Sequence, residues 1–193
     1  INDYYGKRVI SHGGALIGMY SNLTMVPELG FAIAIITNQQ SGAAYTTIKN
    51  EIFNHVMDIK NVESAIERFE RMENNHIDEV TRLNNLKGNG SSALADKDYI
   101  GIYNDKWWDD VKISLNESGL YFTSTRSPSL KGKLEHFEES TFIVRWDDRT
   151  HEADAFVIFS KDNDGNINGF TMKAVSIRTD FSYDFHHLNM IKQ

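Results

Sequence analysis

The sequence contains no cysteine, which excludes disulfide bonds, cysteine-ligated zinc and catalysis by a thiol. It also lacks an excess of basic residues, because 20 Lys and Arg stand against 27 Asp and Glu and the net charge is -7. A chain of this acidity is poorly suited to phosphate backbones, so we expect no nucleic-acid partner. The absence of cysteine fits a cytoplasmic and a periplasmic protein equally.

Long hydrophobic runs are absent too. The longest is Phe31–Ile36, far short of the roughly 20 residues that cross a bilayer as a helix, so we expect no membrane insertion. The chain is 40% hydrophobic and 24% charged, which is the balance of a globular protein of one or two domains. Because it begins at Ile1 without a Met or a signal peptide, we expect it to be a piece of a longer protein.

Residues 1–58 are rich in glycine and small side chains. Strands are predicted at Lys7–Ser11, Gly18–Met25 and Phe31–Thr37, and the last is apolar on both faces, as in a central strand. From Tyr45 to Val56 apolar residues recur with a helical period, and Ser41 is a suitable N-cap.

Residues 59–95 form a charged connector. The pattern over Val62–Leu86 predicts one or two amphipathic helices, with Asn74-Asn75 as the place where a break would fall. The Gly, Ser and Asn residues of Lys87–Ser92 indicate a linker.

Residues 96–193 carry short apolar runs at regular spacing, separated by turns such as Asn116–Gly119 and Asp162–Gly165. About eight short strands with regular turns indicate an antiparallel barrel or sandwich. The fold class is therefore α+β. The predicted strands are Tyr99–Tyr103, Val111–Leu115, Leu120–Thr123, Leu130–Phe137, Thr141–Trp146, Ala155–Phe159, Ile167–Val175 and Phe181–Phe185.

One motif near the N-terminus can carry chemistry. Ser11-His12-Gly13-Gly14-Ala15 places a histidine before two glycines, which let a backbone approach a substrate closely. Alone it is also what a glycine-rich strand end looks like. Together with Gly18, Pro27, Gly30-Phe31, the apolar run and Thr37-Asn38, it resembles the end of the catalytic domain of class C β-lactamase-like and penicillin-binding-protein-like serine hydrolases.

The resemblance covers roughly residues 1–58 and implies roles for three residues. His12 would occupy the basic position of the family's third motif, Gly14 its glycine, and Ala15 would supply a backbone N–H to the oxyanion. It also implies acyl-enzyme hydrolysis of a peptide, amide or ester, with no metal and no organic cofactor. A periplasmic or extracellular location is favoured by the same resemblance, and a cytoplasmic one stays open.

The chain departs from this family where the nucleophile is concerned. The family uses Ser-x-x-Lys, and no serine of this chain has a lysine three residues later. Tyr20-Ser21-Asn22 spells the second motif but follows His12 too closely, so we interpret it as a coincidence on a strand. We therefore expect the chain to be inactive alone and its partner to be the missing N-terminal catalytic part.

The C-terminal region resembles the lipocalin-like domain appended to many hydrolases of this family. The resemblance rests on Tyr99-x-Gly101-x-Tyr103, Leu134–Phe137 with Thr141-Phe142, and Asp184-Phe185-x-x-Leu188. It implies an accessory barrel. The alternative is a non-enzymatic barrel that binds an apolar or cell-wall ligand; a lumen filled with bulky side chains favours the accessory role and a large pocket favours binding.

Three further candidates carry less weight. Trp107-Trp108 could stack on a sugar, although packing is the commoner role of such a pair. Asp162-x-Asp164-Gly165 matches a hairpin turn better than a calcium loop. His186-His187 after Asp184 could ligate a metal, but neighbours on a strand point to opposite faces, so we expect no metal site.

The apolar run Phe31–Ile36 needs a cover. Either strands of a second copy complete the sheet in a homodimer, or the Val62–Leu86 helix folds over it. We favour the dimer, because Glu63, Glu67, Arg68 and Glu70 leave that helix a narrow apolar stripe.

Overall fold

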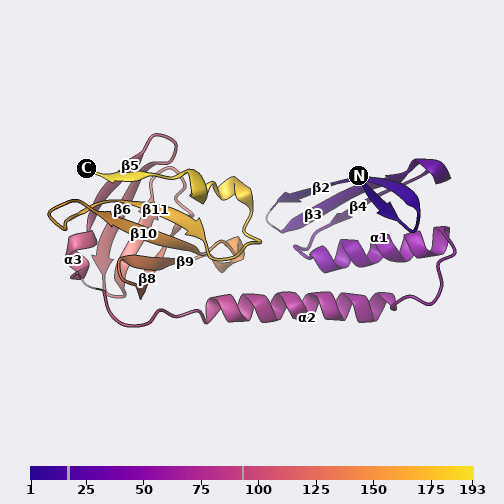
Figure 1. Ribbon diagram of the computed structural model, residues 1–193, viewed down its shortest axis with the longest axis horizontal. Coiled ribbons are helices and arrows are strands. Elements are labelled where there is room, and N and C mark those ends of the chain that lie inside the picture. Colours follow the sequence, from indigo (N-terminus) through magenta and orange to yellow (C-terminus); the bar gives the residue numbers. More distant parts are fainter. Residues whose placement is uncertain (17, 93) are drawn as a thin grey trace. The chain divides into compact units, whose positions relative to one another are not determined.

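The chain forms two compact units, Ile1–Thr81 and Arg82–Gln193, each described here by itself. The computed structural model describes residues 1–16, 18–92 and 94–193. The first unit contains a four-stranded sheet and the second a closed antiparallel barrel of eight strands, which confirms the predicted α+β class (Figure 1). Among the residues described, no helix has the length and apolar character needed to cross a membrane.

The sheet of the first unit is antiparallel, in the order β1-β2-β3-β4. A 3-10 turn at Pro27–Leu29 follows β3. The strands are β1 (Asn2–Tyr4), β2 (Lys7–Leu16), β3 (Met19–Val26) and β4 (Phe31–Thr37).

The expectation that Phe31–Thr37 is a central strand is wrong for the described residues. β4 pairs with β3 alone and forms an edge of the sheet. Its two faces differ, since Ile35 is 8% exposed and Ile36 is 77% exposed. One face of an apolar strand is therefore covered and the other open.

Helix α1 (Gly42–Val56) covers one face of the sheet. It begins as predicted at Ser41, whose Oγ accepts a hydrogen bond from the Ala44 N–H at 3.1 Å. Phe53 is buried against Val9 of β2 and Val26 of β3. Its ring meets that of Phe31 edge to face, with the centroids 5.9 Å apart.

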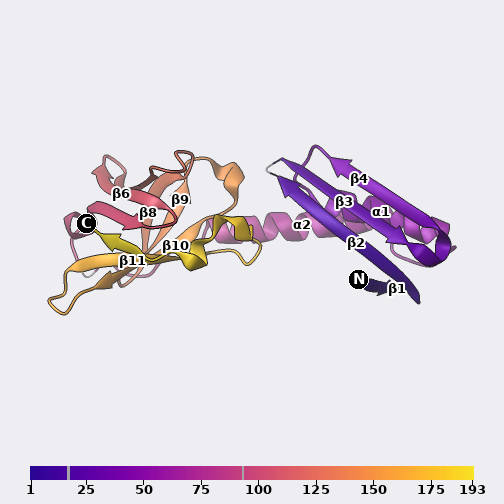
Figure 2. The same cartoon turned by 90° about the horizontal axis from the view of Figure 1, so that it is seen from above.

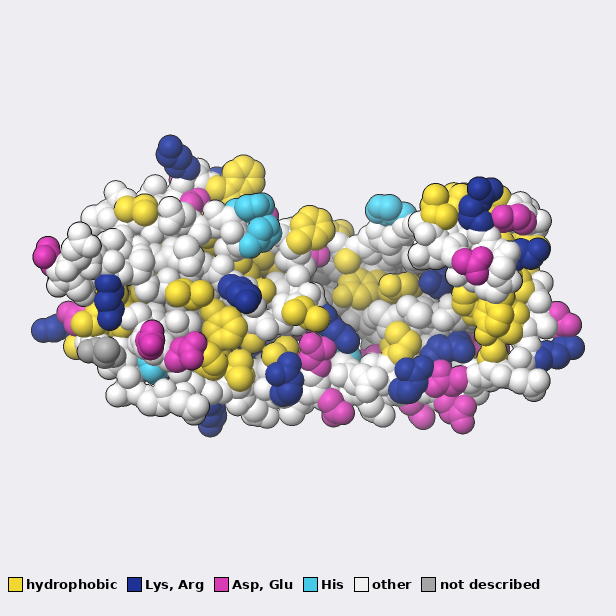
Figure 3. Space-filling model, in the orientation of Figure 1, with side chains coloured by type: hydrophobic (Ala, Val, Ile, Leu, Met, Phe, Trp, Pro, Cys, Tyr) yellow, Lys and Arg dark blue, Asp and Glu magenta, His cyan; other side chains and the backbone are white. Residues whose placement is uncertain are grey.

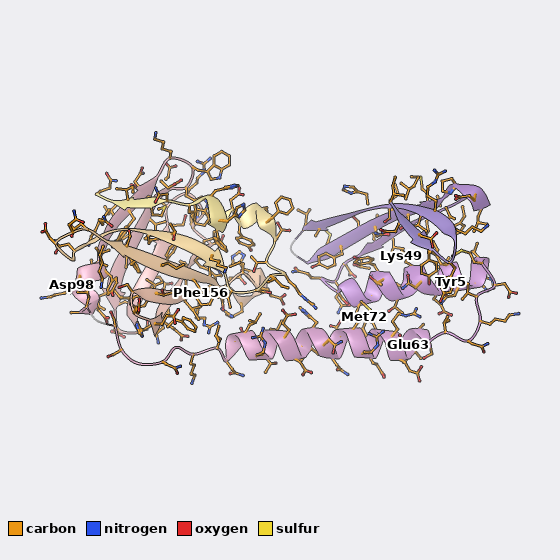
Figure 4. All side chains as sticks on the ribbon, in the orientation of Figure 1. Tyr5, Lys49, Glu63, Met72, Asp98 and Phe156 are labelled. Carbon is orange, nitrogen blue, oxygen red and sulfur yellow. The ribbon has the colours of Figure 1, made fainter. Side chains whose placement is uncertain are left out.

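Helix α2 (Ala65–Asn84) is continuous, without the break considered at Asn74-Asn75. A reciprocal cap begins it: the Ser64 Oγ accepts from the Glu67 N–H, and the Glu67 carboxylate accepts from the Ser64 N–H. Within the first unit α2 runs along α1, and Figure 4 shows Met72 between the two helices. The Ser41 hydroxyl donates to the Glu73 carboxylate at 3.0 Å across this contact.

The second unit begins with the last turn of α2 and is dominated by the barrel. A short helix, α3 (Asp96–Tyr99), precedes it, and the strands are ordered β10-β11-β12-β5-β6-β7-β8-β9 around the closed wall. They are β5 (Gly101–Asp105), β6 (Asp109–Asn116), β7 (Gly119–Ser124), β8 (Lys131–Glu138), β9 (Thr141–Trp146), β10 (Ala155–Lys161), β11 (Ile167–Ala174) and β12 (Met190–Lys192).

Two of the predicted barrel strands need correction. Phe181–Phe185 is not a strand: it contains a 3-10 turn at Phe181–Tyr183 and starts another at Phe185–His187, with Asp184 in the left-handed region at φ 53°. The eighth strand is instead β12, which closes the wall between β11 and β5. Tyr99 ends α3 and does not begin a strand.

The barrel lumen is filled by aromatic side chains. The rings of Tyr99 and Phe142 meet edge to face at 4.9 Å, and those of Tyr103 and Phe170 lie 5.0 Å apart. The Tyr103 hydroxyl donates to the Tyr99 carbonyl at 2.6 Å, and burial raises the pKa of that phenol. A lumen filled by contacting rings, with the Tyr103 hydroxyl hydrogen-bonded, is a packed core.

Arg145 of β9 forms hydrogen bonds with the segment Leu83–Leu86, which precedes the barrel. Its guanidinium donates to the Leu83 carbonyl at 3.0 Å and to the Leu86 carbonyl at 2.5 Å. It also meets the carboxylates of Glu135 at 3.1 Å and Asp154 at 2.7 Å. The Arg145 side chain is 12% exposed, so these partners compensate its removal from water.

We therefore expect Arg145→Ala to loosen the segment before the barrel. Breaking a buried, charge-assisted network of this kind costs about 2–3 kcal/mol. Trypsin should cleave after Lys87 faster in the variant than in the wild type, and the barrel should unfold at lower denaturant. Arg126→Ala is the control, because that side chain is 59% exposed and its loss should change neither readout. Equal cleavage in wild type and Arg145→Ala would contradict the role assigned to this network.

Candidate functional site

The candidate site lies on the part of β2 that pairs with β3 but no longer with β1. β1 pairs only with Lys7–Val9, whereas Ile10–Leu16 pair with β3 on the other side. Among the described residues no strand covers the second edge of Ile10–Leu16. An uncovered strand edge presents N–H and C=O groups to an incoming chain.

The residues predicted for the site all lie on this uncovered segment. His12, Gly14 and Ala15 are exposed and stand opposite Leu23, Ser21 and Tyr20 of β3. Side chains alternate along a strand, so His12 and Gly14 share one face and Ala15 belongs to the other. The structure thus brings His12 and Gly14 to the same open surface.

This open surface faces away from α1. In β3 the buried residues Asn22, Thr24 and Val26 point toward the helix, while Ser21 and Leu23 point the other way. Figure 2 shows the four strands lying in front of both helices. His12 and Gly14, paired with Leu23 and Ser21, therefore belong to the face that no helix covers in the part of the first unit that the structure describes.

The face around His12, here named the open sheet face, is largely apolar. Hydrophobic side chains gather at the surface of the first unit (Figure 3). The open sheet face carries large exposed hydrophobic side chains on three strands, with exposed fractions from 38% to 77%, namely Leu16, Met19, Leu23, Met25 and Ile36.

The idea that the Val62–Leu86 helix folds over the Phe31–Ile36 run is wrong, because α2 lies along α1 on the opposite side of the sheet.

Ser21 is a neighbour of the site that the sequence did not single out for this role. Its Oγ donates to the Gly14 carbonyl at 3.3 Å, and a Cβ placed on Gly14 would lie 2.9 Å from that oxygen. A side chain at position 14 would therefore require the Ser21 hydroxyl to move. The neighbouring Asn22 is 8% exposed, and its Oδ1 accepts from the Thr24 hydroxyl at 2.6 Å. Asn22 thus faces away from His12.

The arrangement offers groups that can orient a substrate. The imidazole of His12 can donate or accept a proton, and the free strand edge can hydrogen-bond an extended substrate. No serine of the chain is followed three residues later by lysine, so the Ser-x-x-Lys pair, in which a lysine activates the serine, is not present in this sequence.

The other candidates are distributed over the barrel unit. Trp108 is 9% exposed and packs against Phe185, while Trp107 is 64% exposed. Asp162 closes the predicted turn between β10 and β11, since its Oδ1 accepts from the N–H groups of Asp164 and Asn166 at 2.9 Å. The burial of Trp108 fits a packing role and the contacts of Asp162 fit a turn, whereas the exposed Trp107 does not fit packing.

Asp184, His186 and His187 lie closer together than predicted. Because the segment is a 3-10 turn and not a strand, one possible ligand atom from each residue lies within 4.8 Å of the others. The alternation argument against a metal site is therefore wrong here. The carboxylate of Asp184 lies 3.3 Å from Nδ1 of His187, whose side chain is 69% exposed. This hydrogen bond accounts for the approach of Asp184 and His187, and the rings of His186 and His187 lie with their centroids 4.0 Å apart.

Comparisons with known proteins give the chain its family. The family model described as a domain of unknown function, DUF3471, matches residues 85–192, and the chain belongs to this family. The match begins at the segment held by Arg145 and ends within β12. No curated protein matches the chain.

Two solved structures are similar to the chain at low identity. They are titled "Crystal structure of SurE" and "Crystal structure of SurE with D-Leu", and both have 13% identity and a TM-score of 0.41. The alignments cover 96% of this chain and 34% and 35% of those chains. The chain thus spans about a third of the length of the solved structures that it matches.

Proposed function

We propose that the chain is the C-terminal part of a β-lactamase-related serine hydrolase, with the DUF3471 barrel as its accessory domain. The whole protein would hydrolyse a peptide, amide or ester through an acyl-enzyme. The observation that carries the proposal is the position of His12 and Gly14 on a strand edge that, among the described residues, has no neighbouring strand. This edge lies beside a sheet face that no described helix of the first unit covers.

In this proposal the open sheet face and the free edge of β2 form one wall of the active site. The missing catalytic part would contribute the Ser and Lys, and its apolar surface would cover Leu23 and Ile36. The substrate would lie along the edge of β2, with the Ala15 N–H directed to the oxyanion. His12 would bind the substrate carboxylate or assist the proton transfers of the nucleophile.

The barrel would then act without chemistry of its own. Its aromatic lumen supports this accessory role, because the bulky side chains of the barrel core pack against one another. The runner-up function, a barrel that binds an apolar or cell-wall ligand, would require a site outside the lumen.

The catalytic part of the proposal is tested in the longer protein. His12→Ala should lower kcat/KM for a chromogenic cephalosporin or a p-nitrophenyl ester by roughly 10- to 1000-fold, as for loss of one transition-state contact. His55→Ala on α1 is the matched control and should leave kcat/KM unchanged. The proposal fails if His12→Ala is as active as wild type, or if a fluorescent penicillin acylates a serine of the isolated chain 1–193.

The isolated chain should cover its open sheet face by pairing with a second copy. We expect light scattering to give the mass of a dimer at tens of micromolar. Ile36→Glu should yield a monomer, because a charge on this face cannot be buried without a partner. Ile158→Glu, on the outside of the barrel, should leave the dimer intact. A wild-type monomer whose β2–β3 amides resist hydrogen exchange would rule the dimer out.

A further inference from the structure

The segment between β11 and β12 brings three metal-ligating side chains together. Asp184, His186 and His187 belong to the 3-10 turn Phe185–His187 and its N-cap. One ligand atom from each of the three lies within 4.8 Å of those of the other two. Two imidazoles and one carboxylate are ligands that Zn²⁺ and related divalent transition metals take in proteins. The donor set therefore matches such a cation in kind.

Buried neighbours fix the backbone that carries these side chains. Phe185 and Leu188 flank the histidine pair, and each is 3% exposed. The ring of Phe185 packs against that of Trp108, with the centroids 5.9 Å apart. Within the turn the His187 N–H donates to the Asp184 carbonyl at 2.9 Å. Since the backbone is already ordered, binding an ion would cost the entropy of the ligand side chains alone.

The contact between Asp184 and His187 already has the separation of two ligands on one cation. The Asp184 Oδ1 lies 3.3 Å from the His187 Nδ1. Bonds of about 2.0–2.1 Å to a tetrahedral Zn²⁺ place two ligand atoms roughly 3.3–3.4 Å apart. A neutral imidazole that carries its proton on Nε2 presents an unprotonated Nδ1. The same two atoms can thus share either the Nδ1 proton or a metal ion.

His186 is placed to supply the third ligand. Its ring centroid lies 4.0 Å from that of His187, and the two ring planes are inclined by 46°. Both side chains are exposed, so the His186 ring can turn toward the ion without displacing a buried neighbour. Three protein ligands on an exposed turn leave the fourth position of a tetrahedral ion to water.

We propose that Asp184, His186 and His187 form a binding site for one Zn²⁺ ion. The ion is coordinated by a carboxylate oxygen of Asp184, by the Nδ1 of His187 and by a ring nitrogen of His186, and water completes its shell. Imidazole ligands favour Zn²⁺ over Mg²⁺, which prefers oxygen ligands in an octahedral arrangement. The site lies wholly in the barrel unit, so it stands independently of the proposed hydrolase activity.

The test titrates Zn²⁺ into the chain 1–193, prepared without an affinity tag, and follows binding by calorimetry and by the imidazole ¹⁵N signals. One Zn²⁺ should bind per chain, and the signals of His186 and His187 should shift. His186→Ala and His187→Ala should each weaken binding at least about tenfold, because even a partner that only supports a metal ligand is worth 10- to 100-fold in affinity. Asp184→Asn should weaken it likewise, with a residue that tolerates the left-handed backbone at φ 53°.

His55→Ala is the matched control, because His55 is an exposed histidine outside the cluster. It should bind Zn²⁺ like wild type, and Mg²⁺ should not displace the ion. Unchanged affinity in His186→Ala or His187→Ala, or an equal loss in His55→Ala, would overturn the site. So would wild-type His186 and His187 signals that stay unshifted at millimolar Zn²⁺. A stoichiometry of one ion for two chains would overturn a site built from one chain.

Discussion

The buried guanidinium of Arg145 is the interaction on which the second unit depends. It joins two carboxylates of the barrel wall, those of Glu135 and Asp154, to the carbonyls of Leu83 and Leu86. Removing an arginine side chain from water costs free energy unless its N–H groups donate hydrogen bonds within the protein. The network therefore fixes where the barrel unit begins, in agreement with the family match from residue 85 and the unit boundary before Arg82. It also holds the Leu86–Gly88 segment close to β8, where Gly88 lies against the backbone of Phe137.

Local chemistry made much of the fold predictable. Ser41 before a helical period predicts the start of α1, and the turns at Asn116–Gly119 and Asp162–Gly165 predict their hairpins, because Asx side chains and glycine satisfy the turn backbone directly. The run Thr141–Trp146 is reproduced as β9 without change. In each case the residues that determine the structure are close in sequence.

The wrong predictions arise where a local sequence pattern is compatible with two structures. Predictions are missing where contacts between residues far apart in the sequence determine the structure. Phe181–Phe185 alternates like a strand, but Asp180 caps a turn through the Ser182 N–H and Asp184 takes a left-handed conformation. The contacts of Arg145 with Leu83 and Leu86 join residues about 60 positions apart. No local sequence pattern predicts them. His12 and Gly14 could be named from their motif, whereas their neighbour Ser21 became visible only through the β2–β3 register.

Among the described residues of the first unit, no helix covers the open sheet face around His12. The proposed function explains this face if a preceding catalytic part packs on it. The most direct test of that claim is the sequence of the gene upstream of the codon for Ile1. The account predicts an in-frame Ser-x-x-Lys followed by Tyr-x-Asn before that codon, and an upstream reading frame without them would contradict it.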